Sequence, residues 1–125
     1  MNFARIRQDI ANAQQHFDYV EAHATSDGKL MALVALQTSR QLYTLAIKFP
    51  ENYPNSMPAV HVRKPNLAIS PHRYADNTIC YLHPSMWNPG RHDLTLVIAR
   101  VAKWLSKYEV YRANGGRWPG AEILH

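Results

Sequence analysis

The chain has 125 residues, of which 46% are hydrophobic and 18% are charged. This length suits one domain, here residues 1–125, that buries roughly two thirds of its unfolded surface without covalent staples. A single cysteine excludes an internal disulfide, so nothing points to an oxidising compartment. No apolar run approaches the roughly 18 residues of a membrane span, and we therefore expect a cytoplasmic protein.

Basic residues outnumber acidic ones. The 14 Lys and Arg against 9 Asp and Glu give a formal net charge of +5. Such a balance favours acidic partners, and a solvated basic face that keeps the protein soluble is an equal alternative. The basic residues do not alternate with aromatic ones as in nucleic-acid motifs, so we expect no nucleic-acid partner.

Residues 3–17 predict an amphipathic helix. Apolar residues recur every three to four positions, and Asn2 is placed to cap the helix start. Arg5 and Arg7 lie two residues apart on this helix, so they flank the apolar stripe on opposite sides. The stripe consists of Phe3, Ile6, Ile10, Ala13 and Phe17.

Four extended segments follow, at residues 17–25, 30–36, 43–49 and 59–63. The second is a continuous apolar run, which is typical of a central strand. The third alternates between apolar and polar residues, with the period of a half-buried strand. Short turns separate the first three segments, which predicts an antiparallel meander with helices covering one face. The fold class is therefore α+β.

Residues 64–93 show neither helical nor strand periodicity. Four prolines block regular structure, yet the segment is too apolar to be disordered. A loop of this length in a compact domain is usually functional. We expect a packed, stiff loop, and it carries the chain's only cysteine, Cys80.

A second helix is predicted from Leu94 onward. Its apolar stripe reaches Tyr108, Asp93 or Thr95 can cap its start, and Asn114-Gly115-Gly116 ends it. Residues 118–125 form a short tail, which we expect to act as a packing clasp, with a partner-binding role as the alternative.

Three motifs resemble those of the ubiquitin-conjugating enzyme family. The pattern F-P-x-x-Y-P-x-x-x-P-x-V begins at Phe49, I-C-x-L contains Cys80, and W-x-P begins at Trp87. The resemblance covers nearly the whole chain. It implies a UBC-like fold with an N-terminal helix, a four-stranded antiparallel meander, a long catalytic cysteine loop and a C-terminal helix. Members of the family usually end with two further helices. In their place this chain has room only for a short tail, as in compact bacterial relatives.

The resemblance implies that Cys80 carries a protein C-terminus as a thioester and passes it to an acceptor. A free cysteine is only a few per cent thiolate near neutral pH, yet that thiolate is strongly nucleophilic. This suits reversible thioester exchange, and the family requires no histidine–aspartate triad. The alternative role for Cys80 is structural, as a small buried hydrophobic residue.

The chain departs from the family shortly before its cysteine. Where eukaryotic members have H-P-N, this chain has Ser70-Pro71-His72. His72 can donate a hydrogen bond to the oxyanion, can orient or deprotonate the incoming nucleophile, or can merely bind backbone as a loop residue. Asn77 is a second candidate for the missing amide.

His83, three residues after Cys80, is a candidate for tuning the thiol or contacting the acceptor, with a plain surface role as the alternative. Cys80, His72, His83 and His92 also suggest a zinc site, but structural zinc sites usually offer several cysteines. We therefore expect no metal and no cofactor. Asp93 can accept a proton from an acceptor amine, although its role as a helix cap is favoured.

Among bacterial relatives, the chain resembles the stand-alone conjugating proteins of cyclic-oligonucleotide (CBASS) antiphage defence operons. This resemblance rests on the short length of the chain, the missing H-P-N motif and the tail. The resemblance implies a carrier that is a nucleotide cyclase (CD-NTase) or a ubiquitin-like protein, a separate activating enzyme and an acceptor protein. It also implies that the first helix, with Arg5 and Arg7, meets the activating enzyme. Two other classes remain open. One is a thiol hydrolase using Cys80 with His72 or His83, and the other is a non-catalytic binding module of the same fold.

Overall fold

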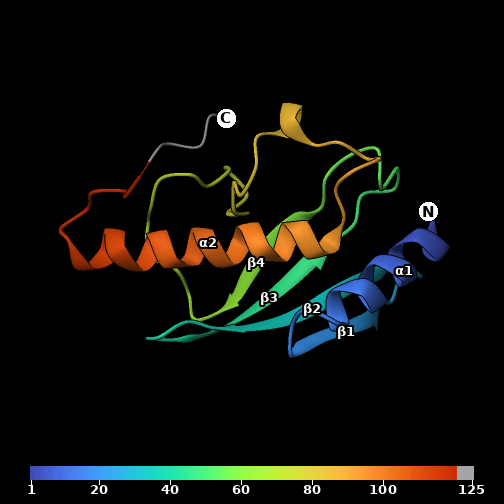
Figure 1. The fold of residues 1–125 in the computed structure, drawn as a ribbon, viewed down its shortest axis with the longest axis horizontal. Helices are drawn as coiled ribbons and strands as arrows, with labels where there is room; N and C mark the ends of the chain where they lie inside the picture. Colours follow the sequence, from blue (N-terminus) through green and yellow to red (C-terminus); the bar gives the residue numbers. More distant parts are fainter. Residues whose placement is uncertain (121–125) are drawn as a thin grey trace.

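The computed structural model describes residues 1–120 and confirms the predicted α+β architecture (Figure 1). Residues 1–120 form two α-helices and one four-stranded sheet, and a short 3₁₀ helix lies within the long segment before the second α-helix. The elements in chain order are α1 (Phe3–Gln14), β1 (Tyr19–Ala24), β2 (Leu30–Gln37), β3 (Leu42–Lys48), β4 (Ala59–Lys64), η1 (Pro84–Met86) and α2 (Leu94–Ala113).

The sheet is the predicted antiparallel meander. Its strands lie in the order β1-β2-β3-β4, so every strand pairs with its neighbour in sequence. Gly28 adopts a φ of 82° in the turn between β1 and β2, a left-handed conformation that glycine reaches without strain. A register shift between Thr44 and Leu45 marks an irregularity where β3 meets β4.

Both predicted helix starts carry the expected kind of cap. Asn2 accepts a hydrogen bond from the Arg5 amide at 3.1 Å. Asp93, rather than Thr95, caps α2 and accepts from the Leu96 amide at 3.1 Å. Each carboxylate or amide oxygen satisfies one of the N–H groups that a helix start leaves without a partner.

The core lies between one face of the sheet and the two helices. Alternate strand residues such as Val34, Leu45 and Val60 point into it and join the buried face of α2. That face carries the predicted stripe together with Trp104, which is 1% exposed. None of the helices within residues 1–120 is long and apolar enough to cross a membrane.

The segment between β4 and α2 is packed, as predicted, and the structure places it alongside α2 (Figure 1). It is more ordered than its lack of periodicity suggests. It contains η1 and an antiparallel bridge between Arg73 and Ile79. Both are built from local turns, which leave no repeating hydrophobic pattern in the sequence.

Candidate active site

Cys80 ends a short hairpin of residues 72–80, which we call the cysteine arm. Within the arm, the Tyr74 amide donates to the Thr78 carbonyl at 3.0 Å, and the Asn77 amide donates to the Tyr74 carbonyl at 2.9 Å. Asp76 Oδ1 accepts from both the amide and the hydroxyl of Thr78, at 3.0 and 2.6 Å. This aspartate turn closes the hairpin without strand-like patterning.

The base of the arm is bonded to β4 and to α2. The Ile79 amide donates to the Val60 carbonyl at 3.0 Å. The His72 carbonyl accepts from the Cys80 amide at 2.9 Å and from Trp104 Nε1 at 3.2 Å. These bonds fix the main chain at Cys80 and directly before it.

The residues after the cysteine are held as firmly. Arg100 Nε donates to the Tyr81 carbonyl at 3.1 Å, and the Tyr81 hydroxyl donates to the Pro58 carbonyl at 2.6 Å. Tyr81 is 1% exposed. The thiol therefore projects from a rigid support rather than from a mobile loop.

The thiol itself is buried. Cys80 is 1% exposed, and its Sγ lies 3.2 Å from the hydroxyl oxygen of Tyr74. Burial raises the pKa of Cys80, because a thiolate loses hydration there, and the hydrogen bond with Tyr74 opposes this in part. The pKa of Tyr74 is raised as well, first by burial and then by Cys80. In this state Cys80 is a protonated thiol near neutral pH.

This environment predicts slow alkylation that depends steeply on pH. We expect iodoacetamide to modify Cys80 more slowly near pH 7.5 than it modifies the same chain unfolded in guanidinium chloride. The rate should rise about tenfold per pH unit, because only the thiolate reacts and its fraction grows tenfold per unit below the pKa. Intact-mass spectrometry over a pH series gives both rates. A plateau of the folded protein's rate near neutral pH would contradict the raised pKa.

His72 contributes its backbone to the site in a way the sequence does not reveal. Its φ is 61°, in the left-handed region that few residues other than glycine and asparagine favour. This conformation directs its carbonyl to both Cys80 and Trp104. Its half-buried ring lies against Trp118, with ring centroids 4.9 Å apart. A role for the imidazole in transfer stays a prediction.

Asn77 also adopts a left-handed backbone, with a φ of 71°, and lies exposed in the turn of the arm. Asparagine tolerates this conformation well, which explains the residue type at this position. Its side chain lines a hollow shared with His61 and Arg73. The structure therefore gives Asn77 a conformational role, and its predicted catalytic role is untested.

His83 and His92 each cap a local turn. His83 Nδ1 accepts from the Ser85 amide at 3.1 Å at the start of η1, and His92 Nδ1 accepts from the Asn88 amide at 3.0 Å. Within residues 1–120, no group of three or more His, Cys, Asp or Glu side chains is arranged to hold a metal ion. The structure does not test whether His83 contacts an acceptor.

Arg5 is committed to contacts inside the protein. Its Nε donates to both carboxylate oxygens of Asp9, at 3.0 and 3.1 Å. Its Nη2 donates to the carbonyls of His92 and Pro89, at 3.0 and 3.4 Å. Asp9 is 3% exposed and also accepts from the hydroxyl of Tyr53. We call Arg5, Asp9 and Tyr53 the α1 network, since it joins α1 to the segment before α2.

Arg7 is the better placed of the two arginines to meet a partner. It is exposed, and its guanidinium lies 5.9 Å from the centroid of the Phe3 ring. The partner-binding role of both arginines stays a prediction. The described part of the tail, by contrast, packs inward, because the Trp118 ring lies 5.3 Å from Trp104. Residues 121–125 of the predicted clasp lie outside the described residues.

The sequence pattern did not indicate two side chains with buried contacts, Asp9 and Tyr74. Asp9 lies on the apolar stripe of the first helix, and a carboxylate at a buried position signals a buried partner. Tyr74 gives no comparable signal, because its proximity to Cys80 depends on the turn of the arm.

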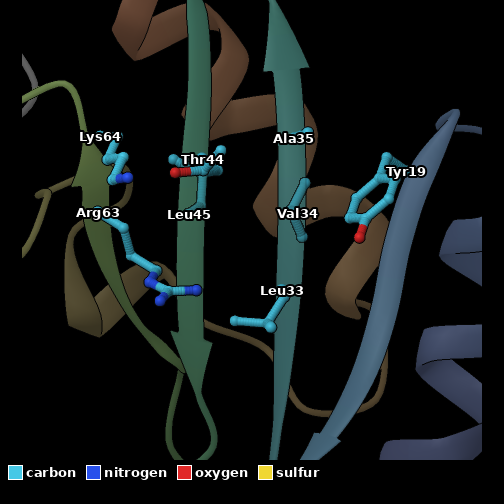
Figure 2. Close-up of a pocket in the computed structure, with 8 residues that line it drawn as sticks. All are labelled: Tyr19, Leu33, Val34, Ala35, Thr44, Leu45, Arg63 and Lys64. Atoms are coloured by element: carbon cyan, nitrogen blue, oxygen red, sulfur yellow. The ribbon is translucent and has the colours of Figure 1, made fainter.

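A separate hollow of about 360 Å³ lies on the open face of the sheet. Figure 2 shows Tyr19 on β1 at one side, Arg63 and Lys64 on β4 at the other, and Leu33 and Thr44 between them. It is lined by neither the cysteine nor a histidine.

The fold is of the kind found in ubiquitin-conjugating (E2) proteins. The solved structure of human ubiquitin-conjugating enzyme E2 G1 aligns with a TM-score of 0.58 and 17% identity, covering 81% of this chain and 91% of that one. This likeness confirms the UBC-like fold. The UEV of Vps23, solved in complex with ubiquitin, is a weaker match, with a TM-score of 0.49, 13% identity, and 85% and 96% of the two chains covered.

The chain belongs to the family of type II CBASS E2 proteins, whose sequence profile matches residues 9–125. The predicted family is thereby confirmed. No curated protein matches the sequence.

Proposed function

We propose that this E2 protein is an acyltransferase that carries the C-terminus of a partner protein as a thioester on Cys80. The observation that carries the proposal is the placement of the only cysteine, in an E2 fold, on an arm bonded to both β4 and α2. The partner is a nucleotide cyclase of the CBASS system, and an activating enzyme supplies its carboxyl group in activated form.

The proposed reaction has two exchanges at one carbonyl carbon. The Cys80 thiolate attacks the activated carbonyl, a carbon–sulfur bond forms, and the donor's leaving group departs. A neutral acceptor amine then attacks the thioester and releases one proton to solvent, an amide bond forms, and the Cys80 thiolate leaves. Tyr74, 3.2 Å from Sγ, is placed to donate a hydrogen bond to that thiolate in both steps.

The geometry favours transfer over hydrolysis. Thiol and serine hydrolases commonly use main-chain N–H groups at the nucleophile to bind the oxyanion. Here the Cys80 amide is already bonded to the His72 carbonyl, and the Ile79 amide to the Val60 carbonyl. The raised pKa of Cys80 is also opposite to that of a cysteine activated by a histidine.

Loading with a short peptide C-terminal thioester tests the proposal. The wild type should accumulate one adduct that dithiothreitol removes, and it should release the peptide as an amide when an amine is added. Cys80→Ala should give no adduct, whereas the exposed control variant Ser39→Ala, in the turn between β2 and β3, should load normally. Catalytic release of the free peptide acid without an adduct would instead assign a thiol hydrolase. Formation of the same adduct in Cys80→Ala would contradict the proposed mechanism.

A further inference from the structure

Helix α2 carries three cations on one face, close to the cysteine. Arg100, Lys103 and Lys107 follow one another at spacings of three and four residues, so their side chains lie in a row along the helix. They line a cleft together with Tyr81 and Trp104. We call this row the α2 cationic strip.

The strip is not neutralised by the described part of the chain. The ion pairs within residues 1–120 involve none of its three members. The acidic residue of α2, Glu109, is bonded elsewhere, since its carboxylate accepts from the hydroxyls of Thr38 and Tyr43 at 2.5 and 2.9 Å. Three adjacent cations with no ion-pair partner among residues 1–120 create a local positive potential that attracts an anion.

The strip adjoins the main chain directly after the thiol, and the cleft that it lines extends to Trp104, which is bonded to the opposite strand of the cysteine arm. Arg100 Nε donates to the carbonyl of Tyr81, the residue directly after Cys80. Trp104, which also lines the cleft, donates to the same His72 carbonyl that accepts from the Cys80 amide. A donor protein whose terminal carbonyl lies at the Sγ atom of Cys80 must place its preceding residues along the surface around Cys80. The α2 cationic strip forms part of that surface.

We propose that the α2 cationic strip docks an acidic segment of the protein whose C-terminus is loaded on Cys80. The inference rests on the proposed function and names the chemistry of its donor. From Arg100 to Lys107 the helix rises about 10 Å, which matches roughly three residues of an extended peptide. A segment with two or three Asp or Glu residues near the donor's C-terminus fits this length and charge. Complementary charge of this kind mainly speeds encounter and selects partners.

Two fluorescent peptides of equal length and identical last residues test the proposal. One carries three Asp or Glu residues upstream of its terminus, and the other carries Asn and Gln there. Fluorescence anisotropy measures binding of the free acids, and intact-mass spectrometry measures loading of Cys80 by the corresponding thioesters. We expect the acidic peptide to bind at least about tenfold more tightly at low salt and to load faster by a similar factor, with both advantages falling as salt rises.

A matched pair of charge reversals locates the effect. Lys103→Glu with Lys107→Glu should abolish the preference for the acidic peptide. Arg63→Glu with Lys64→Glu changes the net charge equally on the sheet, and it should keep the preference because these residues lie outside the strip. Circular dichroism and thermal melts verify that both variants fold.

Three outcomes would overturn the docking site. They are equal binding of the two peptides, an equal loss in both double variants, and tighter binding of an oligonucleotide of the same charge, which would assign the strip to nucleic acid. A different outcome separates the two proposals. If the acidic peptide binds through the strip but neither thioester ever loads Cys80, the proposed function fails and the docking of an acidic segment stands.

Discussion

Replacing His72 by alanine should slow transfer from loaded Cys80 about 100-fold and leave loading intact, if the imidazole stabilises the oxyanion, because removal of one such donor has this scale. The substitution keeps the backbone carbonyl that binds the Cys80 amide and Trp104. Single-turnover transfer to an amine, started from the isolated thioester, measures the chemical step apart from loading.

A conservative variant separates the alternatives for His72. His72→Asn suits the φ of 61° and returns an amide donor at this position, so it should recover much of the transfer rate if the ring acts as a donor. It should stay as slow as the alanine variant if the ring acts as a base. The exposed His23→Ala serves as the control. Equal losses of loading and transfer in His72→Ala would indicate a folding role, and no loss would leave His72 as a loop residue.

Asp9→Ala should lower the free energy of unfolding by about 3 kcal/mol, because it leaves the partners of a buried carboxylate without an acceptor. Asp9 is 3% exposed and holds both the Arg5 guanidinium and the Tyr53 hydroxyl. Burial, and next the hydrogen bond with Asp9, raises the pKa of Tyr53, so this hydroxyl stays a donor throughout the neutral range. Urea unfolding followed by tryptophan fluorescence measures the change.

The exposed Asp18→Ala is the matched control for Asp9, and its effect should stay within about 0.5 kcal/mol. A double-mutant cycle with Tyr53→Phe isolates the contribution of the carboxylate–phenol pair. Unfolding of Asp9→Ala at the same urea concentration as the wild type would show that the α1 network adds nothing to stability.

Periodic hydrophobicity made the regular elements predictable from sequence. The first helix and all four strands lie within three residues of their predicted bounds. The buried face of α1, β2 and β3 repeats in their sequences, whereas β1 and β4 each bury one residue and are bounded mainly by the neighbouring turns and prolines. Phe17 is an instructive boundary. It continues the helical stripe in sequence, yet α1 ends at Gln14, and Phe17 instead packs against the core from the following turn.

The surroundings of the thiol were less predictable, for a physical reason. The cysteine arm depends on two residues with left-handed backbones and on an aspartate turn, and such local bonds leave no periodic signal. The α1 network is a long-range contact, since Arg5 reaches the carbonyl of His92. Sequence spacing placed Arg5 beside the apolar stripe and gave no information about what faces it across the fold.

The bond between Ile79 and Val60 also bears on self-association. β4 is an outer strand, and an uncovered outer strand offers its free N–H and C=O groups to the sheet of another molecule. The cysteine arm occupies part of that edge through the Val60 carbonyl, and the exposed Arg63 and Lys64 place charge on the remainder. The arm that carries Cys80 thus also protects this side of the sheet from edge-to-edge aggregation.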